Sequence, residues 1–506
     1  MPASPLNIGR LIVAFVAGAA LPFAFAPYGY YPLALLCLGV LFHLWDGAER
    51  RSAFISGAAF GLGMFGHGVW WIQISVHQFG LPLYSFSIAV TAAFVCFMSV
   101  YPALCGYLGA VLPAPCRYTR VLMLYPAAWT ATELLRGWLF GGFPWLLIGY
   151  SQVDSPLAVF VPLLGVYGVG FITVTAAASA VVLLRGTVVG RRVAALVLAS
   201  IIIGSLTLGE ISWTRTIGDA APVALIQGAI PQAVKWSHAY RQPSIDLYAK
   251  LSEPHWGKAL IVWPETAIPA FAEEVPASIA ALDARAKDSG TTLLIGMPTG
   301  DPSGDSGYFN SVVQFGDVSG RYDKRHLVPF GEYLPFDRWL RPITTFLRIP
   351  MSNFSPGPAV QLPLSVNGYS IGVSICYEDA YAGEVARALP QANVLVNVSN
   401  DAWFGESIAP HQHLQIARIR ALETGRYLLR ATNTGISAII DDRGKIVAAS
   451  KQFIAAVVSG EMVPRAGSTP AVKYGVTPVV ALCLIIFALL SLVASWRRSR
   501  PLSKPG

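Results

Sequence analysis

The chain has 506 residues, of which 54% are hydrophobic and 13% are charged, and its formal net charge is +8 at pH 7. Ordinary soluble domains are roughly 45–50% apolar and about 25% charged, so this composition excludes a wholly soluble protein. The excess positive charge is largely in short loops between apolar stretches, where it indicates membrane orientation and gives no reason to expect nucleic-acid binding.

Apolar stretches recur through the first 210 residues, and one more lies near the C-terminus. A helix of about 20 apolar residues crosses roughly 30 Å of hydrocarbon. We therefore predict eight membrane spans, at residues 9–27, 31–46, 53–76, 86–112, 120–138, 158–184, 191–209 and 474–496. The first span resembles a secretion signal, but Pro27 directly follows its small residues, so we interpret it as a retained anchor. Glu133 and Arg136, three residues apart, are expected to form an ion pair.

The distribution of basic residues between these spans predicts their orientation. Alternate loops and the C-terminal tail carry them: Arg50, Arg51, Arg117, Arg120, Arg185, Arg191, Arg192, Arg497, Arg498, Arg500 and Lys504. The opposite loops at 27–30 and 77–85 carry no Lys or Arg. The positive-inside rule then places both termini in the cytoplasm and residues 211–473 outside it.

Residues from about 214 to 472 alternate short β-type runs with helical patterns. We predict strands at 223–227, 259–263, 292–297, 311–315, 370–375 and 394–398, helices at 276–289, 380–389 and 411–425, and a hairpin of 436–440 with 445–449. Buried runs without strict alternation are typical of a sheet covered on both faces. The predicted domains are membrane helices at 1–210, a single α/β domain at 211–473, an eighth membrane helix at 474–496 and a basic tail at 497–506.

Cys376 ends the apolar run 369–375 and is followed by Tyr377, Glu378 and Asp379. Of the six cysteines, it alone lies outside the apolar stretches and their short loops. A lone thiol cannot form a local disulfide or a cysteine-rich metal site, so it is either core filler or a nucleophile.

Two other charged residues favour the nucleophile. Glu265 follows the run 260–264, and Lys324 lies in 321–327. Like Cys376, both are expected at strand ends, where active-site groups of α/β folds collect. A thiol is mostly protonated at neutral pH, so Glu265 is suited to be its general base and Lys324 to stabilise an oxyanion. His411 and His413 are two apart on a helix and are interpreted as structural, and we expect no metal and no cofactor.

Together the motifs 263–266, 324–327 and 376–378 resemble the Glu-Lys-Cys triad of the nitrilase, or carbon–nitrogen hydrolase, superfamily. Further segments resemble its membrane branch, the bacterial apolipoprotein N-acyltransferases: Gln227–Gln232 with Lys235-Trp236, His326–Pro335, and Asn400–Gly405. The resemblance implies an α-β-β-α sandwich joined to a polytopic helical membrane domain, and it covers nearly the whole chain.

This resemblance implies an acyltransferase of the bacterial inner membrane, with a periplasmic catalytic domain, that acts in lipoprotein maturation. Cys376 would take an acyl chain from a phospholipid, with phosphatidylethanolamine as the expected donor, and form a thioester. The acceptor would be the α-amino group of the diacylglyceryl-modified N-terminal cysteine of an apolipoprotein. Such ping-pong covalent catalysis splits one difficult transfer into two easier ones.

The resemblance also suggests supporting residues. Glu332 would be a second essential acid that holds Lys324 or the leaving amine, and Tyr377 and Glu378 would shape the site, although strand-end packing and a surface acid are the alternatives. Trp236, Trp403, Phe346 and Leu347 are candidate lipid contacts, the last two within an apolar segment at 336–356 that suggests a membrane-facing arm.

Two other functions remain open from the residues alone. A membrane-anchored amidase or nitrilase-type hydrolase would use the same triad with water as the acceptor, although eight spans exceed what a soluble substrate requires. A transporter or receptor with a degenerate sandwich domain would be expected to lack part of the triad.

Overall fold

The computed structural model describes residues 7–80, 82–300, 307–335, 338–339, 341–342 and 353–499. The chain forms two compact units. One contains Met1–Trp70, Ile88–Ile211 and Tyr474–Gly506, and the other contains Trp71–Ser87 and Ser212–Lys473. The predicted third span, 53–76, is divided between them, because α3 (Arg50–Gly68) ends before α4 (Ile72–Phe79) begins.

The first unit is helical. Its helices are α1 (Ile8–Ala20), α2 (Pro32–Trp45), α3, most of α5 (Tyr84–Val111), α6 (Arg117–Thr119), α7 (Tyr125–Arg136), α8 (Val161–Arg185), α9 (Val188–Leu208) and α17 (Thr477–Ser499). Among the described residues, four helices are long and apolar enough to cross a membrane: Tyr84–Val111, Pro156–Arg185, Val188–Leu208 and Thr477–Trp496. These match the fourth, sixth, seventh and eighth predicted spans, whereas Ile8–Ala24 and Pro32–Trp45 are shorter apolar helices.

Small residues bring the helices of this unit together. A Cβ on Gly18 of α1 or Gly63 of α3 would collide with the backbone of the other helix, so these glycines allow close packing, as is common in membrane proteins. The expected pair of Glu133 and Arg136 is confirmed, with 3.8 Å between Oε1 and Nη2. Glu133 also accepts a hydrogen bond from the backbone of Ile148 at 2.9 Å, so the pair ties α7 to the segment that follows it.

The second unit contains two six-stranded sheets, with strand orders β13-β2-β3-β4-β5-β6 and β12-β11-β10-β9-β8-β7. The first comprises β2 (Ala221–Gln227), β3 (Leu260–Val262), β4 (Thr292–Gly300), β5 (Tyr308–Phe315), β6 (Gly320–Asp323) and β13 (Ala456–Met462). The second comprises β7 (Leu364–Val366), β8 (Tyr369–Ile375), β9 (Val394–Ser399), β10 (Leu428–Thr432), β11 (Ala438–Ile440) and β12 (Ile446–Ala449). A small ladder pairs β1 (Thr214–Thr216) with β14 (Arg465–Gly467).

Alternate residues of the central strands face two different cores. Val223 and Leu225 of β2 belong to a cluster that also contains Ile371 and Val396 of the other sheet, so the two sheets pack face to face. Their neighbour Ile226 instead packs in a cluster with residues of the helices on the outer face. Each sheet is therefore buried on both sides, which explains the continuous apolar runs in its parallel strands.

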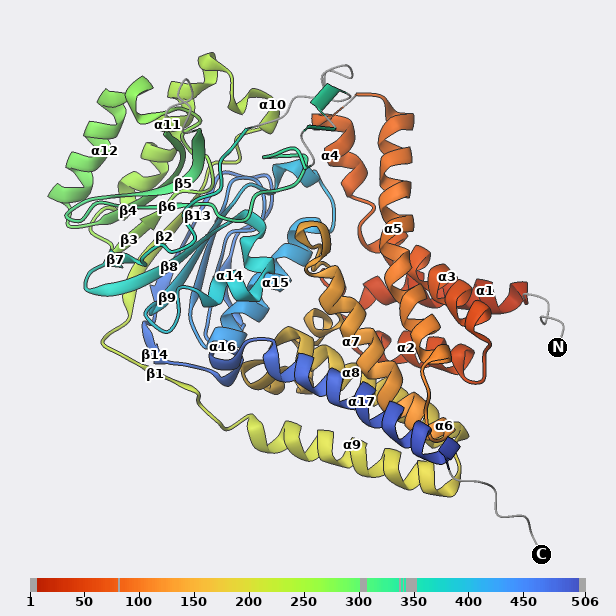
Figure 1. The fold of residues 1–506 in the computed structure, drawn as a ribbon. Coiled ribbons are helices and arrows are strands. Elements are labelled where there is room, and N and C mark those ends of the chain that lie inside the picture. Colours follow the sequence, from red (N-terminus) through yellow and green to blue (C-terminus); the bar gives the residue numbers. More distant parts are fainter. Residues whose placement is uncertain are drawn as a thin grey trace, which may run out of the picture. The chain divides into compact units, whose positions relative to one another are not determined.

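Helices cover both outer faces of the sandwich (Figure 1). On the first sheet these are α11 (His238–Ser252) and α12 (Pro276–Asp288), and on the second they are α14 (Ala382–Ala386) and α15 (Ala409–Thr424). Two further short helices are α10 (Gln232–Lys235) and α16 (Pro470–Tyr474). The predicted α-β-β-α sandwich is thus confirmed, as is its combination with a helical unit.

Candidate active site

All three candidate catalytic residues lie where strands end. Glu265 comes three residues after β3, Lys324 directly follows β6, and Cys376 directly follows β8 as the first residue of a short 3-10 helix, η8 (Cys376–Ala380). Because β3 and β6 belong to one sheet and β8 to the other, the site is assembled across the sheet interface. All three side chains are buried.

Two carboxylates share the Lys324 ammonium. Lys324 Nζ donates to Glu332 Oε1 at 2.9 Å and lies 3.5 Å from Glu265 Oε1. Asn310 of β5 bridges the same two oxygens, because its Nδ2 donates to Glu265 at 2.7 Å and to Glu332 at 2.9 Å. Glu332 Oε2 in turn accepts from the backbone N–H of Val328 at 2.8 Å. The second acid suggested by sequence therefore does lie against Lys324, whereas Asn310 was missed.

The other oxygen of Glu265 is placed differently. Within the part of the chain that the structure describes, no hydrogen-bond donor reaches Glu265 Oε2, although this atom is buried. A buried carboxylate oxygen without a donor keeps a lone pair available for a proton. The geometry of Glu265 is thus that of a group fixed through one oxygen and able to act as a base through the other.

Electrostatics keep the Cys376 thiol protonated and the Lys324 amine charged. Burial raises the pKa of the Cys376 thiol well above its usual value, Glu265 adds to this increase, and Lys324 opposes it. Burial alone would lower the pKa of Lys324, but Glu332, Glu265 and the Cys376 thiol raise it instead. At neutral pH the site therefore holds a protonated thiol and an ammonium, so a base is needed before the sulfur can attack.

The turns that carry these residues are strained. Cys376 has φ +56°, Thr266 beside the general-base candidate has φ +51°, and Phe330 in the loop before Glu332 has φ +63°. Non-glycine residues in this left-handed region cost about 1 kcal/mol or more each, and they concentrate at active sites. Gly296 of β4 allows the turn that carries Glu265 to pack closely against this strand, because a Cβ there would collide with the backbone around Pro264.

Glu378 joins the turn that carries Cys376 to the loop that follows Lys324. Its Oε1 accepts from the backbone N–H groups of Arg325 at 2.7 Å and His326 at 3.0 Å. Its Oε2 accepts from the backbone N–H of Ile375 at 2.8 Å and from the Tyr322 hydroxyl at 3.0 Å. Burial raises the pKa of Glu378 despite these donors. The side chain is fully buried, so the alternative of a surface acid is wrong.

Tyr377 packs beside the lysine. Its hydroxyl donates to the backbone carbonyl of Leu327 at 2.7 Å, and its ring centroid lies 5.8 Å from Lys324 Nζ. Tyr377 thus contacts the same loop that Glu378 holds. The expectation that both residues shape the site fits these contacts.

The candidate lipid contacts differ in their surroundings. The Trp236 side chain, directly after α10, is 52% exposed. Trp403 is partly buried against Phe79 of α4, with ring centroids 4.4 Å apart. Phe346 and Leu347 lie outside the described residues, as does most of the apolar 336–356 segment.

Lys235 is a further buried amine beside the site. Its Nζ donates to the backbone carbonyl of Glu265 at 3.0 Å, and burial lowers the pKa of Lys235 to about 8, although the Glu265 carboxylate opposes this shift. In the sequence, Lys235 is notable only as part of the segment that resembles the membrane branch of the superfamily. Nothing in the residues around Lys235 indicates that its side chain is buried, since the neighbouring Trp236 is itself exposed.

Two family models match this chain. The model for the apolipoprotein N-acyltransferase N-terminal domain matches residues 17–179, and the carbon–nitrogen hydrolase model matches residues 222–471. Among solved structures, a carbon–nitrogen hydrolase from Helicobacter pylori G27 is 15% identical, with a TM-score of 0.37 over 56% of this chain and 96% of that one.

Curated relatives match over nearly the full length. The apolipoprotein N-acyltransferase of Methylococcus capsulatus is 44% identical over 481 residues, which cover 94% of each chain. That of Nitrosomonas europaea is 41% identical over 501 residues, covering 97% of this chain and 99% of the relative. The chain is a membrane protein and an acyltransferase, and it belongs to the apolipoprotein N-acyltransferase family.

Proposed function

We propose that the chain transfers a fatty acyl group from a phospholipid, through a thioester on Cys376, to the α-amino group of a diacylglyceryl-modified N-terminal cysteine. The observation that carries these residue roles is the Glu265–Lys324–Glu332 cluster, whose charges act on the buried Cys376 thiol. The donor that we propose is phosphatidylethanolamine, and the acceptor is an apolipoprotein.

The first half of the reaction forms the thioester. Glu265 accepts the thiol proton through its uncommitted oxygen, and the Cys376 thiolate attacks the ester carbonyl of the phospholipid. Lys324 faces the negative charge that develops on the carbonyl oxygen and stabilises it. When the tetrahedral intermediate collapses, the carbon–oxygen bond breaks, and the departing lysophospholipid oxygen takes the proton back from Glu265.

The second half transfers the acyl group to nitrogen. An α-amino group has a pKa near 8, so a useful fraction is neutral at physiological pH. Its nitrogen attacks the thioester carbonyl, Glu265 accepts a proton from that nitrogen, and the carbon–sulfur bond breaks. Glu265 then returns the proton to the Cys376 thiolate. Every residue ends in its starting protonation state, so the cycle can repeat.

A single-turnover experiment tests this sequence. Purified protein incubated with phosphatidylethanolamine vesicles alone should accumulate an acyl-enzyme, seen as a mass increase on the Cys376 peptide that neutral hydroxylamine removes. Adding a diacylglyceryl peptide should discharge it at least about tenfold faster than water does, because a transferase must protect its intermediate from hydrolysis. The same incubation with phosphatidylglycerol vesicles tests whether the rate of acyl-enzyme formation depends on the head group of the donor.

Two results would contradict the proposal. If the thioester hydrolysed as fast as it formed and the peptide made no difference, the chain would be an amidase-type hydrolase. If acyl groups reached the peptide while Cys376 stayed unmodified, the transfer would not proceed through this thiol.

We also propose that the protein lies in the bacterial inner membrane with residues 211–473 in the periplasm. The basic loops support this orientation. An alkaline phosphatase fusion after residue 220 should therefore be active, and a fusion after Arg498 should be inactive, because the phosphatase folds only outside the cytoplasm. The reverse pattern would place the catalytic site in the cytoplasm.

A further inference from the structure

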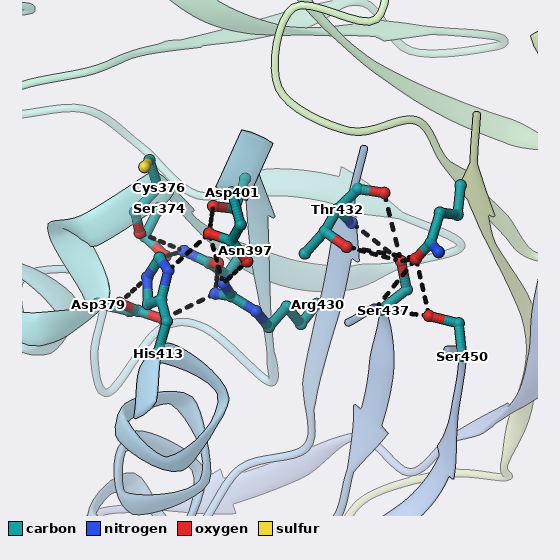
Figure 2. Close-up of polar contacts among 12 residues, drawn as sticks. Ser374, Cys376, Asp379, Asn397, Asp401, His413, Arg430, Thr432, Ser437 and Ser450 are labelled. Carbon is teal, nitrogen blue, oxygen red and sulfur yellow. Dashed lines mark hydrogen bonds and ion pairs between the residues drawn. The ribbon is translucent and has the colours of Figure 1, made fainter. Parts of the chain in front are cut away.

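Four charged side chains lie buried directly behind the nucleophile turn. They are Asp379 of η8, Asp401 of the 3-10 helix η9 (Asp401–Phe404), His413 of α15 and Arg430 of β10, and none is more than 1% exposed. Figure 2 shows them converging on one another beside Cys376. We refer to these four residues as the charge cluster.

Both ring nitrogens of His413 face carboxylate oxygens. Nδ1 lies 2.9 Å from Asp401 Oδ1, and Nε2 lies 3.0 Å from Asp379 Oδ1. A carboxylate accepts hydrogen bonds, so a proton on each ring nitrogen satisfies both contacts, and this geometry favours an imidazolium at His413. Burial and Arg430 would lower the pKa of His413, but Asp379 and Asp401 outweigh them and raise it.

Arg430 joins the same two carboxylates. Its guanidinium donates to Asp379 Oδ2 at 3.2 Å and to Asp401 Oδ2 at 3.0 Å. With His413 protonated, two positive charges balance two negative ones, and the charge cluster is neutral. Buried charges are tolerated when they are paired and hydrogen-bonded in this way.

One amide connects the charge cluster to the nucleophile. Arg430 Nη1 also donates to Asn397 Oδ1 on β9. The other end of this amide, Nδ2, donates to the backbone carbonyl of Cys376 at 3.0 Å and to Ser374 Oγ at 3.0 Å. The amide therefore holds the one residue of β8 and η8 that must keep a left-handed backbone to present its sulfur.

We propose that Asn397, oriented by the charge cluster through Arg430, is a positioning residue that holds Cys376 in its reactive conformation. This inference rests on the proposed role of Cys376 as nucleophile. A hydrogen bond to a charged donor polarises the Asn397 amide and strengthens its second bond to the Cys376 carbonyl. The protein thus uses a buried ion cluster to fix a strained turn.

The neutrality of the charge cluster has a second effect on the thiol. The charges that act on Cys376 include Glu265, Lys324, Asp401 and Glu332, and Asp401 disfavours the thiolate. His413 and Arg430 compensate that negative charge. Removing the imidazolium would leave a net charge of −1 behind the sulfur and make the thiolate harder to form.

The test compares Asn397→Ala with two matched controls in the full-length protein. Asn397→Ala should lower the rate of acyl-enzyme formation from phosphatidylethanolamine by about 10- to 100-fold, since a small displacement of a reacting atom has effects of this size. The KM for phospholipid should change little, whereas the loss of buried hydrogen bonds should lower the melting temperature without unfolding the protein. Alkylation of Cys376 by iodoacetamide, followed by mass spectrometry, should slow in parallel.

The controls separate positioning from general loss of buried polar contacts. Ser374→Ala removes the other partner of the Asn397 amide and leaves its bond to Cys376. Ser437→Ala removes a hydroxyl from a second buried cluster in Figure 2, where it donates to Gln227 Oε1 at 2.7 Å. Both variants should acylate within about threefold of wild type. Equal losses of the acylation rate in all three variants would show that Asn397 has only a structural role.

A second substitution guards against the possibility that Asn397→Ala fails to fold because of the cavity it creates. Asn397→Leu keeps the side-chain volume, removes both hydrogen-bonding groups, and should show the same loss of acylation and alkylation. The inference is overturned if the folded variants acylate as wild type does, or if neither variant folds. Failure of wild-type protein to acylate Cys376 at all would instead contradict the proposed nucleophile.

His413→Gln tests the charge balance. This variant should alkylate Cys376 more slowly than wild type at the same pH and should need a higher pH to reach the wild-type rate. His411→Gln, on the same helix and hydrogen-bonded to Gln452, is the control and should leave that pH dependence unchanged. An unshifted profile in a folded His413→Gln protein would show that the imidazolium does not act on the thiol.

Discussion

Replacing Cys376 by alanine should abolish acyl transfer while leaving a folded, membrane-inserted protein. Loss of a covalent nucleophile typically lowers turnover by about 10⁴-fold or more, because the remaining groups cannot form the intermediate. The rate of peptide acylation and the mass of the Cys376 peptide measure this effect. The melting temperature should change little, since alanine removes one sulfur atom and keeps the Cβ at this turn.

Two further variants make the result specific. Cys376→Ser should also lack hydroxylamine-sensitive acyl-enzyme, because its hydroxyl is far less acidic than a thiol and Glu265 cannot ionise it to the same extent. Cys96→Ala removes a thiol from α5 and should transfer normally. Near-normal turnover in either Cys376 variant would mean that another group attacks the phospholipid.

The second large effect is expected for Glu265→Gln, which should form the acyl-enzyme about 10³-fold more slowly. Glutamine can still accept the hydrogen bond from Asn310, but it cannot take the thiol proton. The Cys376 pKa is raised, so almost no thiolate forms unaided at neutral pH. The residual acylation rate of the variant should therefore increase with pH, because solvent hydroxide then replaces the missing base.

The carboxylate of Glu274 provides the matched control. It lies at the surface, where it pairs with Arg241 at 3.0 Å, so Glu274→Gln should acylate as wild type does. Wild-type rates of acyl-enzyme formation in Glu265→Gln, followed by failure only when the peptide is added, would assign Glu265 to the second half-reaction alone.

The positions of Glu265 and Cys376 at strand ends could be predicted from the sequence, because a strand-forming run precedes each of them. The run before Glu265 is apolar and the run before Cys376 is rich in β-branched residues, and each forms a strand that ends within three residues of the candidate catalytic side chain. Their order along the chain could therefore be interpreted without a structure. The functional roles assigned to these residues stay predictions until the variants are measured.

Other parts of the fold were missed for physical reasons. Strand β10 contains Arg430, and a charged residue in a strand normally indicates an exposed face, whereas here its partners come from three other elements. Helix α11 contains Pro243 in its interior and carries few apolar residues. Asn310 looks like an interruption of β5 until Glu265 and Glu332 are brought to it by the fold.

Helix α4 makes the sandwich a composite of two distant parts of the chain. Ser75 donates to the backbone carbonyl of Trp403, and Trp71 packs on Phe404 with ring centroids 4.7 Å apart. Trp71 also donates to Gln412 at 3.1 Å. A fragment limited to residues 212–473 would leave these aromatic faces uncovered and prone to aggregate. The compact unit that contains the sandwich is therefore discontinuous, and recombination that exchanges this unit between relatives must carry residues 71–87 with it.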